Sequence, residues 1–189
     1  MAYITDSFDD RVVELLQNSG AGLLPTDTIY GLSCRALDEH AVERLHKLKD
    51  RSPGKPFIVL ISDIKMLDLL SISAEQASVI KNYWPGALSA VLQSNAPNFL
   101  SRGTNSLAIR MPNYPKLLDL ISKAGPIVST SANIEGQEPV HSVSEAQSLF
   151  GSQLDFYVDA GPLDNPPSTL AVLKDGRLEV VRQGAVKIK

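Results

Sequence analysis

The sequence lacks the features that mark secreted or membrane-bound chains. Its one cysteine, Cys34, cannot form an internal disulfide, which fits a reducing cytoplasm. The strongest apolar run, FIVLI at 57–61, is far shorter than the roughly 20 residues that a membrane helix needs. The first residues do not pair a basic segment with an apolar run, so no signal peptide is expected. We therefore expect a cytoplasmic protein without a membrane partner.

Strong charge and metal-ligand patterns are also missing. A net charge of −3 argues against a surface built mainly for nucleic-acid backbones, although it leaves room for a local basic cleft. The three histidines, His40, His46 and His141, show no metal-ligand spacing, so no metal-binding residue is predicted. Neither a P-loop nor a dinucleotide-binding glycine motif occurs. Any nucleotide would have to be held by side-chain cations and strand-end loops.

Length and composition favour one domain over residues 1–189. Hydrophobic residues make up 43% of the chain. A chain of this size buries roughly 70% of the surface of its unfolded state, so its core needs no disulfide or metal.

Helical and strand patterns alternate along the chain. Apolar spacing and capping residues predict helices at 9–19 (ending at Gly20), 39–50 (capped by Asp38), from Ser73 to about Trp84, 115–123, and after Ser142. Strands are predicted at 21–24, 57–61, 85–92, 106–111 and 126–130, and in a C-terminal hairpin that turns at Asp175-Gly176. This order predicts an α/β or α+β fold with an open, mixed β-sheet flanked by helices.

The most unusual segment is cationic and stiff. Residues 47–57 read KLKDRSPGKPF, with cations at Lys47, Lys49, Arg51 and Lys55. One interpretation is a solvated helix end whose charges complement the helix dipole. The other is a binding site for a polyanion.

Three small-polar loops accompany that segment, PTDTIYGL at 25–32, STSAN at 129–133 and PPST at 166–169. Hydroxyl and amide groups at strand ends suit a small polar ligand. Arg110 and Arg182 each end an apolar strand, and the arginine fork can hold a carboxylate or phosphate. Each feature alone is better explained by turn chemistry or by a surface ion pair. Their combination favours one anion-binding cleft.

Covalent catalysis has little support. Ser52 and Lys55 have S-x-x-K spacing, but neighbouring prolines deny that segment the usual helix start. Cys34 has no base nearby in sequence. A hydrolase that uses Ser131 or Ser52 as its nucleophile is one rival hypothesis.

Several stretches occur together in a fixed order over nearly the whole chain: PTDTIYGLS, LHKLKDRSPGKPF, WPGALSAVL, LAIRMP, VSTSANIEG, VDAGP with PSTLAV, and VVRQG. In combination they resemble the short, single-domain form of the YrdC-like threonylcarbamoyl-AMP synthases. The resemblance implies a twisted open sheet with a large concave basic face. It also implies a nucleotidyltransferase that joins L-threonine, bicarbonate and ATP into threonylcarbamoyl-AMP and pyrophosphate, for threonylcarbamoyladenosine modification of tRNA.

The resemblance also implies roles for particular residues and partners. Mg²⁺ is expected to enter with ATP, a separate tRNA threonylcarbamoyl transferase complex to act downstream, and contact with tRNA or double-stranded RNA is left open. Two departures from the family pattern are Ser33 in place of a common glycine and Asp27 where glutamate is frequent. Lys49 and Arg51 are implied as catalytic; Lys49, Arg51, Lys55, Ser106, Ser131, Asn133 and Arg182 as ATP-binding; and Thr26, Thr28, Arg110 and Ser168 as threonine-binding.

The second rival hypothesis is a module that binds double-stranded RNA or tRNA without catalysis. Net charge −3 and the lack of RNA-stacking aromatic motifs disfavour it.

Overall fold

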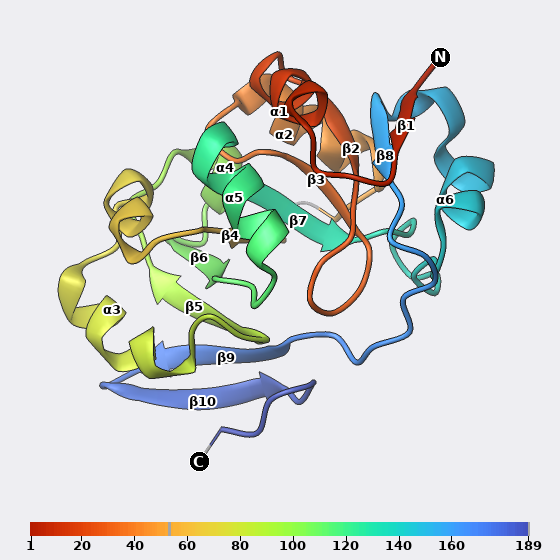
Figure 1. The fold of residues 1–189 in the computed structure, drawn as a ribbon. Helices are drawn as coiled ribbons and strands as arrows, with labels where there is room; N and C mark the ends of the chain where they lie inside the picture. The colour runs from red at the N-terminus through yellow and green to blue at the C-terminus, as the bar shows by residue number, and fades with distance from the viewer. Residues whose placement is uncertain (53, 189) are drawn as a thin grey trace.

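A computed structural model describes residues 1–52 and 54–188, and within them ten strands form one sheet (Figure 1). The strand order is β1-β8-β2-β3-β7-β4-β6-β5-β9-β10. The strands are β1 (Tyr3–Thr5), β2 (Ala21–Leu24), β3 (Gly31–Arg35), β4 (Ile58–Leu60), β5 (Leu88–Gln93), β6 (Ser106–Arg110), β7 (Ile127–Ser131), β8 (Phe156–Val158), β9 (Thr169–Lys174) and β10 (Arg177–Arg182).

The sheet is mixed and open, as the sequence predicts. Four pairs are parallel, β1 with β8, β2 with β8, β4 with β6, and β5 with β9, and the other pairs are antiparallel. The apolar run FIVLI contains β4, which lies between β7 and β6 and so takes the central position expected of it.

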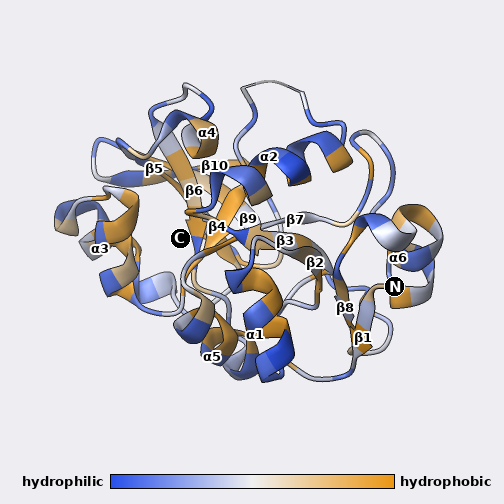
Figure 2. Ribbon diagram, turned by 90° about the horizontal axis from the view of Figure 1, so that it is seen from above, coloured by the Kyte–Doolittle hydropathy of each residue, from blue (hydrophilic) through white to orange (hydrophobic). Residues whose placement is uncertain are grey.

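Helices cover both faces of this sheet, and strand residues alternate between them. The helices are α1 (Asp10–Gln17), α2 (Glu39–Leu48), α3 (Ala74–Ile80), α4 (Asn98–Ser101), α5 (Pro115–Ala124) and α6 (Val143–Phe150), with 3₁₀ turns at Ile64–Leu70, Lys81–Tyr83 and Gly151–Gln153. In β7, Ile127 packs with the apolar residues of α1 and α5, while its neighbour Val128 packs with those of α2 and α6. Figure 2 shows α1 and α5 side by side, apart from α2.

Three of the predicted helix caps are present. Asp38, Ser73 and Ser142 each accept a hydrogen bond from the backbone N–H three residues on. The capping box predicted at Ser73 is incomplete, because the Gln76 side chain instead exchanges two hydrogen bonds, of 3.0 and 2.8 Å, with the backbone of Gln93. Gln76 therefore joins α3 to the end of β5.

The predicted end of the first helix is corrected by two residues. The helix stops at Gln17, and Ser19, not Gly20, has the positive φ of 61°. Gly20 has another use: a Cβ on it would collide with the Leu15 carbonyl oxygen, which accepts a 2.8 Å hydrogen bond from the Gly20 N–H. Glycine here permits the close approach of the chain as it leaves the helix.

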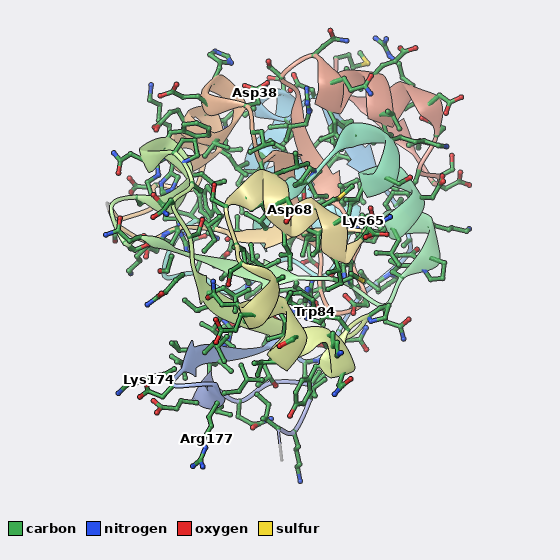
Figure 3. The ribbon with its side chains drawn as sticks, turned by 90° about the vertical axis from the view of Figure 1, so that its left-hand side faces the viewer. Asp38, Lys65, Asp68, Trp84, Lys174 and Arg177 are labelled. Atoms are coloured by element: carbon green, nitrogen blue, oxygen red, sulfur yellow. The ribbon has the colours of Figure 1, made fainter. Side chains whose placement is uncertain are left out.

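The C-terminal hairpin forms as predicted. Asp175 and Gly176 have φ values of 50° and 74°, which is the left-handed pair that a two-residue hairpin turn requires. Lys174 and Arg177 flank the turn and project from the end of the hairpin in Figure 3. In the part of the chain that the structure describes, no helix is both long and apolar enough to cross a membrane.

Candidate active site

A cavity of about 480 Å³ lies over one face of the sheet. Its floor includes Ser129, Ile58, Ala108 and Val91, which are register partners on the four adjacent strands β7, β4, β6 and β5. Leu60 also lines the cavity and packs in the apolar cluster beneath α1 and α5. The cavity therefore occupies the part of this face that those two helices leave uncovered.

Residues from five separate segments form the walls of this cavity. They are the loop that leads into β3, the cationic segment, the ends of β7 and β10, and the loop before β9. Four of the lining residues are cations and, among the described residues, none is an acid, histidine or cysteine. The structure thus brings together most of the site residues implied by the sequence: Thr26, Thr28, Arg51, Lys55, Arg110, Ser131, Ser168 and Arg182.

The hydroxyl-rich wall depends on a glycine. Gly31 begins β3 and pairs with Ser131 of β7. A Cβ on Gly31 would lie well inside contact distance of the Ser129 Oγ atom. Glycine at this position therefore lets β3 and the serine-rich end of β7 approach closely at the cavity.

Arg110 is the most buried cation of the cavity. Its side chain is 5% exposed, and Nη1 donates a 3.0 Å hydrogen bond to Thr28 Oγ1 and lies 3.4 Å from Asp27 Oδ1. Its Nε has no hydrogen-bond partner among the described residues. Burial lowers the pKa of Arg110 and the charge of Asp27 opposes that shift, so the guanidinium stays charged. An anion in the cavity would meet a desolvated cation with donor capacity left.

Lys49 does not line the cavity but lies behind its wall. The side chain is buried, and Nζ donates to the carbonyl oxygens of Ser131 (2.8 Å) and Asn133 (3.0 Å) and to Asn133 Oδ1. Ser131 Oγ donates to the same Asn133 oxygen at 2.7 Å. Burial, with a smaller contribution from the nearby Arg51, lowers the pKa of Lys49 to about 8. Through these hydrogen bonds, Lys49 and Asn133 hold the STSAN loop in place. Their contacts with phosphate stay predictions.

Arg51 shapes the cationic segment that contains it. Its Nε donates to the Lys55 carbonyl oxygen at 2.8 Å and its Nη2 to that of Pro56 at 3.0 Å. The guanidinium carbon also lies 4.9 Å from the centre of the Phe57 ring. Arg51 both lines the cavity and fixes the turn that carries Lys55.

Ser168 lies directly before β9, and Arg182 ends β10. Ser168 Oγ lies 2.8 Å from Ser89 Oγ of β5, and the Ser168 carbonyl oxygen accepts a 3.0 Å hydrogen bond from Arg182 Nη2. Ser106 begins β6, at the opposite end of that strand from Arg110, and is not among the lining residues. Its predicted ATP contact stays a prediction.

Tyr30 is a support of this site whose role the sequence did not reveal. The side chain is fully buried, its hydroxyl donates to the Gly161 carbonyl oxygen at 2.7 Å, and it accepts from the Ala160 N–H at 2.9 Å. It therefore connects the cavity wall to the long segment that runs from β8 to β9 (Figure 1). In a sequence, such a supporting residue can be sought as an aromatic side chain with a polar tip that stands among small residues.

Replacement of Tyr30 by phenylalanine is expected to lower the free energy of unfolding by about 1 kcal/mol, because one buried donor–acceptor group is lost. Urea unfolding followed by fluorescence would measure this change. Tyr83, whose side chain is only partly buried, offers a matched Tyr83→Phe control that should change stability less. Equal effects at the two positions would contradict the supporting role of Tyr30.

The remaining titratable candidates lie away from the cavity. His46 is buried against the Phe57 ring, and burial lowers its pKa to about 4. Burial raises the pKa of the Cys34 thiol well above its ordinary value, so it stays protonated at neutral pH. The described residues contain no group of three or more His, Cys, Asp or Glu that could hold a metal ion.

Sequence and fold are those of one family. The family model named Sua5/yciO/yrdC, described as "Telomere recombination", matches residues 14–184, and the chain belongs to this family. A threonylcarbamoyl-AMP synthase of Pseudoalteromonas translucida is 36% identical over 166 residues, which are 82% of this chain and 88% of that protein.

Two solved structures place the fold in the same family. Escherichia coli YciO has a TM-score of 0.85 at 26% identity, covering 100% of this chain and 97% of that one. Pyrococcus abyssi Sua5 complexed with L-threonine has a TM-score of 0.85 at 28% identity, covering 97% of this chain. This chain spans only 57% of that Sua5 chain.

Proposed function

We propose that this protein is a threonylcarbamoyl-AMP synthase, which makes threonylcarbamoyl-AMP and pyrophosphate from L-threonine, bicarbonate and ATP. The observation that carries the proposal is the lining of the cavity. Four cations and several hydroxyl groups converge there, and the described lining residues include no carboxylate, histidine or cysteine. Such a site suits a reaction that needs alignment and charge neutralisation rather than a nucleophile from the protein.

The proposed reaction supplies its own nucleophile. The threonine amine and bicarbonate combine, with loss of water, into a carbamate. A carbamate oxygen then forms a bond to the α-phosphorus of ATP, and the bond from that phosphorus to the bridging oxygen breaks and releases pyrophosphate. The protein has to hold two anions near each other and to stabilise the charge on the departing pyrophosphate.

The positions of the cations suggest how the two substrates divide the cavity. Arg110, beside Thr28, is assigned to the threonine carboxylate, because its planar fork is buried and has a free donor. Arg51 and Lys55 are assigned to the phosphates. Thr26 and Ser168 complete the proposed threonine end; Ser131, Asn133, Ser106, Lys49 and Arg182 complete the proposed ATP end. The L-threonine bound to the Sua5 relative supports an amino-acid subsite in this fold.

Mg²⁺ is proposed only as the counter-ion that ATP brings. Because the described residues offer no cluster of three acidic, histidine or cysteine ligands, the phosphates and water would supply most of its coordination. It would neutralise part of the phosphate charge. No step is assigned to a metal ligand of the protein.

Transfer of the product to tRNA belongs to the same proposal. A mixed anhydride of this type needs an acceptor, and we assign the transfer to tRNA to a separate transferase complex. A module that binds RNA without catalysis is disfavoured, because a cavity of about 480 Å³ suits small molecules rather than a duplex surface.

Pyrophosphate release from ATP and Mg²⁺ tests the proposal directly, with threonine and bicarbonate omitted in turn. Release that requires both co-substrates is the expected result. Release without either one would instead support a nucleotide hydrolase. Binding to RNA that falls steeply with salt, together with no release at all, would support the RNA-binding alternative.

Arg51→Ala is expected to weaken ATP binding by about 10- to 100-fold, because one charge-assisted contact and the turn that carries Lys55 are both lost. Calorimetric titration with ATP would measure the change. Arg51→Lys keeps the charge but not the two guanidinium hydrogen bonds, so it should recover only part of the affinity. Wild-type ATP affinity in Arg51→Ala would remove Arg51 from the proposed site.

A further inference from the structure

A carboxylate from another part of the chain is bound to the cationic segment. Glu135 follows the STSAN loop, and its Oε1 forms a 2.6 Å ion pair with Lys55 Nζ. Its Oε2 accepts hydrogen bonds from the Ser52 backbone N–H and from Ser52 Oγ, the latter at 3.0 Å. An ammonium, a hydroxyl and a backbone N–H are also the donors that commonly bind a phosphate oxygen.

The backbone holds Glu135 in this position. Its N–H donates a 3.0 Å hydrogen bond to the carbonyl oxygen of Lys49, at the end of α2. Lys49 Nζ in turn binds the carbonyl oxygens of Ser131 and Asn133. The loop carrying Glu135 is thus bonded on both sides to the cationic segment, and the carboxylate lies there as a fixed feature of the fold.

The contacts of Glu135 are strong for a partly exposed group. Its side chain is 26% exposed and that of Lys55 is 58% exposed. The hydrogen bonds from Lys55 and Ser52 lower the pKa of Glu135 to about 2, so it is ionised at any physiological pH. Lys55 also lines the cavity, and Glu135 does not. The two residues therefore meet at the rim, where a phosphate group in the cavity would compete for the same ammonium.

We propose that Glu135 is a built-in competing anion: it holds Lys55 and the Ser52 N–H in the empty site and must release them when a polyphosphate binds. The identity of the polyphosphate as ATP rests on the proposed function, whereas the competition itself does not. Among the described residues, Lys55 is the one lining residue that the Glu135 side chain pairs with or hydrogen-bonds, so Glu135 acts as a positioning residue that sets polyphosphate affinity.

The test uses Glu135→Gln, which removes the charge but keeps an oxygen that can accept from Ser52. Loss of one partly exposed competing ion pair is expected to tighten binding by about two- to fivefold. Calorimetric titration of the whole protein with inorganic tripolyphosphate would measure this change without depending on the nucleotide reaction. Glu138→Gln is the matched control, since it removes the same charge from an exposed residue three positions along.

Tighter tripolyphosphate binding in Glu135→Gln than in both the wild type and Glu138→Gln supports the proposal. Tripolyphosphate binding in Glu135→Gln that is equal to or weaker than in the wild type overturns the proposal, because Glu135 then only supports the loop. An equal gain in Glu138→Gln also overturns it, because the gain is then a general effect of charge. Pyrophosphate release by the wild type, measured alongside, separates the outcomes. If that release needs threonine and bicarbonate while Glu135→Gln binds no more tightly, the competition has failed and the proposed function has not.

Discussion

Replacing Arg110 by glutamine is expected to raise the threonine concentration needed for half-maximal pyrophosphate release by about 100-fold. The Arg110 side chain is 5% exposed beside Thr28 and Asp27, and none of the described residues accepts a hydrogen bond from its Nε. A carboxylate bound there gains a charge-assisted interaction away from competing water. The ATP requirement should change by less than about threefold, because the proposed phosphate contacts lie at the cationic segment. Steady-state kinetics with each substrate varied would measure both effects.

The stability of this variant needs its own control. Removal of Arg110 leaves Asp27 with a buried charge, and such orphaned charges cost about 3–5 kcal/mol of stability. Combining Arg110→Gln with Asp27→Asn removes both charges and should restore most of the melting temperature without restoring threonine affinity. Equal losses for threonine and ATP in the stable double variant would contradict the assignment of Arg110 to the threonine carboxylate.

Replacing Lys49 by methionine is expected to lower the free energy of unfolding by about 3 kcal/mol and to abolish most ATP binding. Methionine fills a similar volume, but it leaves the buried carbonyl oxygens of Ser131 and Asn133 without their common donor. The STSAN loop would lose its anchor to α2, and the site would lose a cation. Urea unfolding and calorimetric ATP titration would measure the two effects. Lys47→Met, at an exposed position two residues earlier, should change stability by less than about 0.5 kcal/mol.

The lowered pKa of Lys49 also gives ATP binding a pH dependence. Burial and Arg51 lower this pKa to about 8, and only the protonated amine attracts a polyphosphate. Affinity for ATP should therefore be constant below pH 8 and fall as pH rises beyond it, because the proton must be taken up again on binding. Lys49→Arg cannot lose its charge in this range, so its residual affinity should stay constant. A wild-type affinity that is flat up to pH 10 would contradict this dependence.

Local patterns predicted the parts of the fold that local chemistry determines. Asp38 begins a helix because its carboxylate accepts from the Ala41 N–H, and Asp175-Gly176 forms a hairpin turn because both residues accept a positive φ. The central position of FIVLI follows from its continuous apolar character, since Val59 packs in the apolar cluster on one face of the sheet and Leu60 in the cluster on the other. These signals need no knowledge of distant residues.

Strands that depend on distant partners escaped prediction. β1 and β8 have three residues each: β1 pairs in parallel with β8, and β8 pairs in parallel with both β1 and β2, although 150 residues of sequence separate β1 from β8. β3 was hidden because GLSCR reads as the end of a turn, and it becomes a strand by pairing with β2 and β7. Tertiary pairing of this kind leaves no local pattern in short segments.

The residues of the site also divide into those that the sequence predicted and those that depend on distant partners. Residue types and the family resemblance predicted the cations and hydroxyls that line the cavity, such as Arg51 and Arg110. Asp27, the buried partner of Arg110, was noted only as a departure from the family pattern, and Glu135 was not recognised at all. Both act on partners far away in the sequence. An acid beside a predicted cationic cleft is the signal that would have pointed to either.

The order of the strands also bears on how this protein reaches its native state. The cavity combines Thr26 with Arg182, and its floor joins β7, β4, β6 and β5, so no short contiguous piece of the chain contains it. Contacts between residues so distant in sequence require large loops to close first, which makes folding slow compared with that of helical bundles of similar size. A ribosome-bound chain cannot complete the cavity before Arg182 has emerged. Substrates that bind only the finished cavity will then favour the folded state by mass action.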